Sequence, residues 1–157
     1  TFTPQVDADI VTKGYSDGND YKCGAFSTNL IKVMPTDFIA NTSRDRYVIS
    51  SLTSPNRFAV QTGHFGTSLY AFIRIPKAYE ASTIQVYASS TVGATAVEAF
   101  SYNYTTGEYV TKGEGDFNET IDITNIEGTT TIDLVIELNP ASTSVYIYGA
   151  KIVLSPV

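Results

Sequence analysis

The feature that most constrains the fold is the stretch of residues 129–156, which contains two long strand patterns separated by the turn dipeptide Asn139-Pro140. In the first pattern, aliphatic residues at positions 132, 134, 136 and 138 alternate with Asp133, Val135 and Glu137, which is the period of a strand with one buried face. The second pattern, residues 144–154, is apolar at both odd and even positions. This stretch therefore predicts a central strand inside one of two packed sheets.

The remaining sequence also consists of short strand patterns at regular spacing, separated by Pro, Gly, Asn and Asp residues. No run of ten residues has the period of a helix, and 157 residues suffice for one domain with its own core. We predict an all-β fold, a two-sheet antiparallel β-sandwich or jelly roll of about ten strands over residues 21–157, after an extended N-terminal connector over residues 1–20. The predicted strands are residues 25–33, 46–52, 57–61, 69–75, 83–89, 96–104, 108–112, 120–126, 131–138 and 144–154.

The charge and hydropathy patterns exclude two classes of partner. The formal net charge is −6 and the ten Lys and Arg residues are scattered, so no basic stripe is present to follow a phosphate backbone. No apolar run reaches the roughly eighteen residues that a membrane-spanning helix needs. We expect neither a nucleic-acid partner nor a membrane partner.

Two residues that often carry chemistry, Cys23 and His64, each occur once and lie far apart in the sequence. Cys23 has no nearby His, and His64 lies in a Gly-rich loop without a serine nucleophile motif. We interpret Cys23 as a packed small residue and His64 as a turn residue, with a reactive thiol and a general base as the alternatives. The sequence thus predicts no catalytic residue and a chain that is not an enzyme, while a hydrolase that uses a pair of carboxylates remains the open alternative.

The densest acidic group lies in and after a Gly-rich turn, where Glu114, Asp116 and Glu119 follow one another closely. Hard cations take carboxylate and carbonyl oxygens as ligands, so these three residues are the candidate site for Ca²⁺. The alternative is an acidic turn in contact with solvent. We expect no other cofactor.

An aromatic hairpin is the candidate ligand site. Phe100, Tyr102 and Tyr104 alternate along one predicted strand, and Tyr109 follows on the partner strand after a short turn. Flat rings on one exposed face can stack on the apolar face of a sugar, while nearby amide and carboxylate groups bind its hydroxyls. We therefore expect a glycan to contact the hairpin, and the alternative is that the rings belong to the core or to cross-strand pairs. The predicted ligand-binding residues are Tyr102, Asn103, Tyr104, Glu108 and Tyr109.

Residues 4–17 read Pro-Gln-Val-Asp-Ala-Asp-Ile-Val-Thr-Lys-Gly-Tyr-Ser-Asp. This run resembles a phrase common in tail-fibre and head-fibre proteins of tailed bacteriophages, where it lies between shaft segments or before the terminal knob of a homotrimer. The resemblance implies a homotrimer at the virion surface, in contact with other virion proteins. The expected contacts between chains are Val6, Ile10, Val11 and Tyr15. An acidic linker without this identity is the alternative.

The order of the last three strand patterns, from residue 118 to residue 154, resembles the closing strands of carbohydrate-binding modules and galactose-binding-like jelly rolls. That resemblance implies the fold and carries over no binding residue. Our main hypothesis is a bacteriophage virion structural protein, a fibre knob or capsid decoration domain that binds host-surface glycans. The alternative is a carbohydrate-binding module of a secreted enzyme, located outside the cell.

Overall fold

The computed structural model describes residues 29–41, 46–50, 57–62, 67–140 and 144–157. The chain divides into two compact units, Thr1–Ile31 and Lys32–Val157, and the fold described below is that of the second unit. The predicted connector over residues 1–20, its expected oligomer contacts, Cys23 and His64 all lie outside the described residues.

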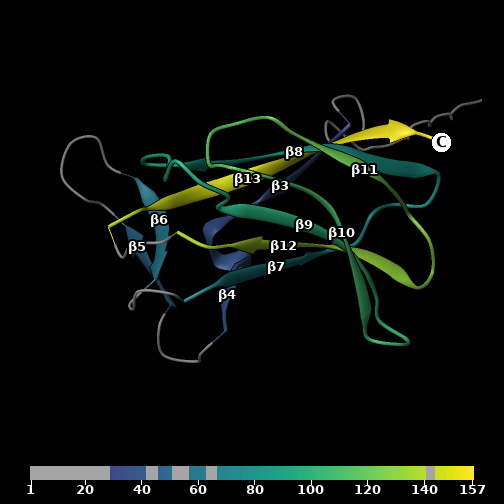
Figure 1. Ribbon diagram of the computed structural model, residues 1–157, viewed down its shortest axis with the longest axis horizontal. Coiled ribbons are helices and arrows are strands. Elements are labelled where there is room, and N and C mark those ends of the chain that lie inside the picture. The colour runs from purple at the N-terminus through teal and green to yellow at the C-terminus, as the bar shows by residue number, and fades with distance from the viewer. Residues whose placement is uncertain (1–28, 42–45, 51–56, 63–66, 141–143) are drawn as a thin grey trace, which may run out of the picture. The chain divides into compact units, whose positions relative to one another are not determined.

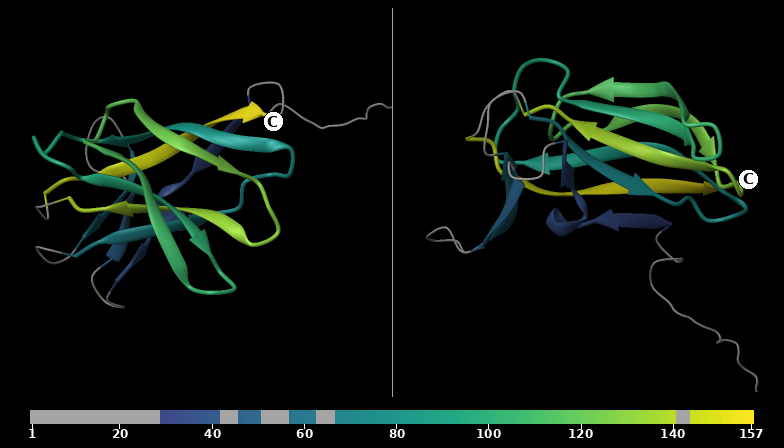
Figure 2. Two further views of the ribbon diagram at one scale, coloured as in Figure 1. Left: turned by 45° about the vertical axis from the view of Figure 1, so that its right-hand side comes forward. Right: turned by 90° about the horizontal axis from the view of Figure 1, so that it is seen from below.

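Two β-sheets form the layers of the second unit (Figures 1 and 2). The first has five strands in the order β10, β9, β12, β7, β4. The second has six strands, in the order β11, β8, β13, β6, β5, with β3 also pairing with β13. The bounds are β3 (Leu30–Val33), β4 (Ile39–Ala40), β5 (Arg46–Ser50), β6 (Phe58–Thr62), β7 (Leu69–Ile73), β8 (Tyr79–Ala88), β9 (Val97–Asn103), β10 (Glu108–Gly115), β11 (Ile121–Glu127), β12 (Ile132–Leu138) and β13 (Ile147–Pro156).

The all-β prediction is confirmed. Within the described residues, the helical content is one 3₁₀ turn, η2 (Pro35–Asp37). The strand pairs with a defined register, such as β12 with β9 and β13 with β8, are antiparallel. Two elements were not predicted, η2 and the two-residue strand β4, because neither is long enough to show a period.

The strands on either side of the Asn139-Pro140 turn are consecutive in the chain but lie in different sheets. β12 is the middle strand of the five-stranded sheet, between β9 and β7, and β13 is an inner strand of the other sheet, between β8 and β6. The predicted central position of the second pattern is therefore confirmed. The chain therefore changes sheet between Leu138 and Ile147.

The core between the sheets fixes which side chains of β12 point outward. Leu134, Ile136 and Leu138 are fully buried, as are Ile147 and Ile152 of β13. Burying each such side chain contributes about 1.5–3 kcal/mol, and a slip of one residue would move all three β12 residues to the opposite face. The outward direction of residues 133, 135 and 137 therefore follows from the core.

Candidate functional site

The outer face of the five-stranded sheet gathers aromatic side chains from three strands. In the register of the sheet, Phe72 of β7 lies opposite Val135 of β12, and Val135 lies opposite Phe100 of β9. Further along the strands, Tyr102 of β9 lies opposite Tyr109 of β10. Cross-strand partners share a face, so these residues form one continuous surface.

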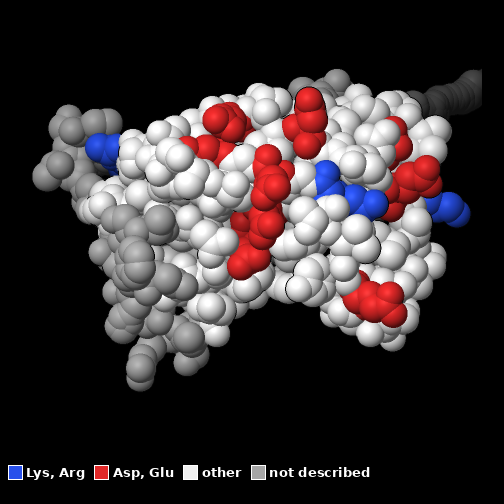
Figure 3. All heavy atoms as spheres, in the orientation of Figure 1, with Lys and Arg blue, Asp and Glu red and all other residues white. Residues whose placement is uncertain are grey.

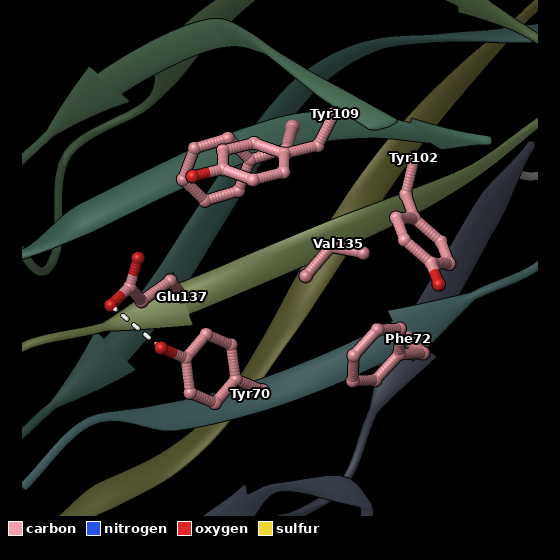
Figure 4. A pocket seen from close by; sticks show the side chains of 7 residues that line it. Tyr70, Phe72, Tyr102, Tyr109, Val135 and Glu137 are labelled. Atoms are coloured by element: carbon pink, nitrogen blue, oxygen red, sulfur yellow. Dashed lines mark hydrogen bonds between the residues drawn. The ribbon is translucent and has the colours of Figure 1, made fainter. Parts of the chain in front are cut away.

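This surface is hollowed, and we call the depression the aromatic hollow (Figure 4). Its volume is about 230 Å³. Tyr109 meets Phe100 edge to face, with ring centroids 5.1 Å apart, and Phe72 meets Tyr102 in the same way at 6.0 Å. The lining residues are Tyr70, Phe72, Phe100, Tyr102, Tyr109, Val135 and Glu137.

The exposure of the rings distinguishes the floor of the hollow from its walls. Phe100 is only 8% exposed and forms the floor together with Val135. Phe72 and Tyr109 are 58% and 66% exposed, which is unusual for large aromatic side chains of a folded sheet. Contiguous apolar surface of this kind, bordered by polar groups, is typical of a binding site.

One hydrogen bond supplies the polar part of the hollow. The Tyr70 hydroxyl donates to Glu137 Oε2 over 3.1 Å (Figure 4). Burial raises the pKa of the Tyr70 phenol, and the Glu137 carboxylate raises it further, so the phenol stays protonated as a donor. The hollow thus presents a hydroxyl and a carboxylate beside the rings.

A row of carboxylates lies across three strands beside the hollow, and one of them, Glu137, also lines it. Glu98 of β9 lies opposite both Glu137 of β12 and Glu114 of β10, and we call these three residues the acidic row. Figure 3 shows acidic side chains in a line over β9 and β12. Burial raises the pKa of Glu98, and the charges of Glu137 and Glu114 add to this effect. The row is therefore a zone of mutual repulsion.

At the opposite end, the charges are paired. Arg74, just after β7, donates from Nε to Asp133 Oδ1 over 2.8 Å, and Asp133 lies opposite Tyr102 in the register. Most of the Arg74 side chain is exposed, so this ion pair adds little to stability. The ion pair balances the charge of Asp133, whereas the acidic row consists of carboxylates alone.

The structure separates the predicted ligand residues into two groups. Tyr102 and Tyr109 line the hollow. Tyr104 lies beyond the end of β9, where its hydroxyl donates to the Thr130 carbonyl over 2.6 Å. Asn103 shapes the turn, because its Oδ1 accepts from both the backbone N–H and the hydroxyl of Thr105. Glu108 lies opposite Asn103 at the end of the hairpin, outside the lining.

Four lining residues were not found from the sequence: Tyr70, Phe72, Val135 and Glu137. They belong to β7 and β12, which are far apart in the sequence but are neighbours in the five-stranded sheet. A local signal was present, since Tyr70 and Phe72 alternate along β7 with the buried residues Leu69 and Ala71. The pairing of β7 with β12 has no such local signal.

The three candidate calcium ligands serve different parts of the structure. Glu114 belongs to the acidic row, and Glu119 Oε1 accepts from the backbone N–H of Asp116 over 3.2 Å. Asp116 accepts from the backbone N–H groups of Val92, Gly93 and Phe117. Within the described part of the chain, no group of three or more His, Cys, Asp or Glu residues is placed to hold a metal ion. Calcium binding stays an untested prediction.

The Asp116 side chain is the anchor of the loop after β8. Its burial alone would raise the pKa of this carboxyl, but the N–H donors from Val92, Phe117, Gly93 and Ala94 outweigh burial and lower it. The carboxylate borders a second, more polar depression of about 450 Å³, which Glu119 and the loop residues 93–95 also line.

None of the described helical segments is long and apolar enough to cross a bilayer.

A comparison with models of protein families gave no match, and neither did a comparison with curated proteins. Solved structures gave several. One is the CBM36-1 domain of a multidomain xylanase from the hindgut metagenome of Trinervitermes trinervoides, with 15% identity, a TM-score of 0.47, and coverage of 82% of this chain and 100% of that one. Another is CsCBM6-3 of Clostridium stercorarium in complex with cellobiose, with 10% identity, a TM-score of 0.44, and coverage of 81% and 94%.

A third match is the GH26-CBM35 β-(1,4)-mannanase of Podospora anserina, with 10% identity and a TM-score of 0.48. The matched region covers 83% of this chain and 28% of the mannanase chain. Because the identities and TM-scores are low throughout, the fold of this chain rests on its own strand order and pairing. These comparisons give no support to a bacteriophage fibre.

Proposed function

We propose that the chain is a carbohydrate-binding module that holds a pyranose in the aromatic hollow of its five-stranded sheet. The observation that carries this proposal is the hollow itself, with exposed Phe72 and Tyr109 beside the hydrogen-bonded pair of Tyr70 and Glu137. A sugar has an apolar face and a hydroxyl rim, and this surface offers a partner for each.

Strand pairing and contacts between rings restrain the aromatic side chains of the hollow. Phe72, Phe100 and Tyr109 stand on paired strands, and the edge-to-face contact between Phe100 and Tyr109 restrains the more exposed of these two rings. A preorganised site avoids the cost of ordering side chains, which is about 0.5–1.5 kcal/mol for each immobilised side chain. Binding by a rigid sheet face therefore needs no rearrangement of the fold.

Two settings remain for such a module. The first is a carbohydrate-binding module of a secreted enzyme, located outside the cell. The virion hypothesis and its homotrimer depend on residues 4–17, which lie outside the described residues, and they stay predictions. That the chain acts by binding and not by turnover also stays a prediction.

The test is a binding measurement on single ring substitutions. We expect a gluco-, xylo- or manno-oligosaccharide to bind the intact chain in isothermal titration calorimetry, and Phe72→Ala and Tyr109→Ala each to weaken binding by about tenfold. The control is Tyr87→Ala on β8 of the other sheet, where the ring is also partly exposed and outside the hollow. Equal affinity of all three variants and the intact chain would place the site elsewhere.

A further inference from the structure

The sheet that carries the aromatic hollow has a negative net charge. The strands of its sheet carry five carboxylates and one lysine, and Arg74 follows directly after β7. Five negative charges against two positive ones leave a net charge of −3 on this sheet. The carboxylates are Glu98, Glu108, Glu114, Asp133 and Glu137, and the lysine is Lys112.

The negative charge is concentrated at one end of the hollow. Asp133 is paired with Arg74, whereas Glu98 lies opposite two further carboxylates, Glu114 and Glu137. Glu98 therefore forms two cross-strand pairs of like charge. Like charges directly opposite one another on neighbouring strands destabilise a sheet. A cation bound over the row would relieve this repulsion.

The faces of the aromatic rings add to the same field. The π-face of Tyr or Phe is negative and attracts a cation lying above it, and this attraction increases when the cation is partly desolvated. Phe72 and Tyr109 are exposed within the same hollow that contains Glu137. Rings and carboxylates together form the surroundings that favour an organic ammonium group.

The geometry of the acidic row favours an extended ligand over a metal ion. Neighbouring strands lie about 4.8 Å apart, so a line across three strands spans roughly 10 Å. Metal ligands converge on one point, and no such group occurs in the part of the chain that the structure describes. A chain of sugars that carries repeated positive charges matches the line better than one ion does.

We propose that the occupant of the aromatic hollow is a cationic amino sugar, a chain of glucosamine-type units whose ammonium groups face Glu98, Glu114 and Glu137. This inference rests on the proposed function and specifies its substrate class. Each ring of the sugar stacks as a neutral pyranose would, and the ammonium adds charge-assisted hydrogen bonds to the row. Sugars that carry carboxylates or sulfates are repelled.

The experiment compares hexamers of glucosamine, N-acetylglucosamine, glucose and galacturonic acid by isothermal titration calorimetry. We expect the glucosamine hexamer to bind about tenfold more tightly than the two neutral hexamers. This preference should shrink when the ionic strength rises from about 0.01 M to about 0.15 M, because the groups are partly exposed to solvent. The galacturonic acid hexamer should not bind.

The variant Glu98→Gln with Glu114→Gln tests whether the row causes the preference. In this double variant the affinity ratio of the glucosamine and glucose hexamers should fall towards one, and a thermal melt verifies that it is folded. The control variant is Glu127→Gln on β11, which removes one charge from an exposed position of the other sheet. It should leave the affinity ratio of the glucosamine and glucose hexamers unchanged.

The outcomes separate the two proposals. Equal or tighter binding of the glucose hexamer, or an unchanged ratio in the double variant, overturns the amino-sugar assignment and leaves the proposed function standing. Tighter binding of a lysine hexapeptide than of the glucosamine hexamer also overturns the assignment, in favour of a basic protein. Absence of binding by every hexamer overturns the assignment, and absence of binding by xylo- and manno-oligosaccharides as well overturns the proposed function.

Discussion

At the scale of single residues, Asp116 shows how one carboxylate can order a loop. Its oxygens accept N–H groups from Val92, Gly93 and Phe117, at distances of 2.7–3.2 Å. Hydrogen bonds to a charged acceptor are stronger than neutral ones, and each contributes about 1.5–3 kcal/mol. The residue was predicted as a metal ligand, but in the structure backbone N–H groups surround it.

The pKa of Asp116 makes a prediction about acid stability. Because its folded pKa is lowered, its contribution is complete above the ordinary aspartate pKa of about 3.9 and is lost as the pH falls through the folded pKa. Asp116→Asn should lose about 2 kcal/mol of unfolding free energy near neutral pH and show a flatter pH dependence below about pH 4. Thermal unfolding across this range measures both effects. Asp122→Asn at an exposed position of β11 is the matched control.

Glu98 makes the opposite prediction, because its folded pKa is raised. The unfolded chain releases this proton more readily, so stability falls as the pH rises from the ordinary glutamate pKa of about 4.3 through the folded pKa. Glu98→Gln should therefore raise the melting temperature near pH 7, and the gain should vanish below about pH 4. A gain that persists at low pH would point to packing as the cause, and not to charge.

At the scale of elements, the β9–β10 hairpin carries one wall of the hollow. The hairpin turn spans residues 104–107, and Tyr109 is the second residue after it. The turn is closed by the N–H of Gly107, which donates to the Asn103 carbonyl over 2.8 Å. Gly107 has a φ of 79°, a conformation that glycine adopts without strain. The side chain of Asn103 then fixes the start of the turn.

Asn103→Ala tests whether this residue contacts ligand or only shapes the turn. The loss of its two hydrogen bonds to Thr105 should lower the unfolding free energy by about 1 kcal/mol. Affinity for sugar should change by less than about threefold, which corresponds to well under 1 kcal/mol. Denaturant unfolding and calorimetry on the same preparation give the two numbers. A large loss of affinity at unchanged stability would restore Asn103 to the binding site.

At the scale of the whole molecule, the sequence predicts the layers better than the site. Alternation along residues 132–138 correctly indicated the buried and outward sides of β12, because a period of two is a local property. The hollow required knowing that β12 lies between β9 and β7, and strand order depends on contacts between distant segments. Tyr102 and Tyr109 could be found because one hairpin joins them, and Phe72 and Glu137 could not.

The predicted division of the chain can be tested by truncation. If residues 1–20 are a connector, their removal should change the melting temperature by no more than a few degrees. The affinity for sugar should change by no more than about twofold. Analytical ultracentrifugation of the full and truncated chains then shows whether those residues cause oligomerisation, as the homotrimer hypothesis requires. Failure of the truncated chain to fold would contradict the connector.

The position of β13 in the six-stranded sheet has a consequence for the order of folding. This strand pairs with β6 and β8, which precede it by many residues, and also with β3. Without β13, the six-stranded sheet has no strand to connect β6 with β8. Contacts between distant segments slow folding, because the loops must close before the contacts form. During synthesis, the six-stranded sheet is therefore incomplete until residues 147–156 have been made, and apolar side chains of the earlier strands stay uncovered until then.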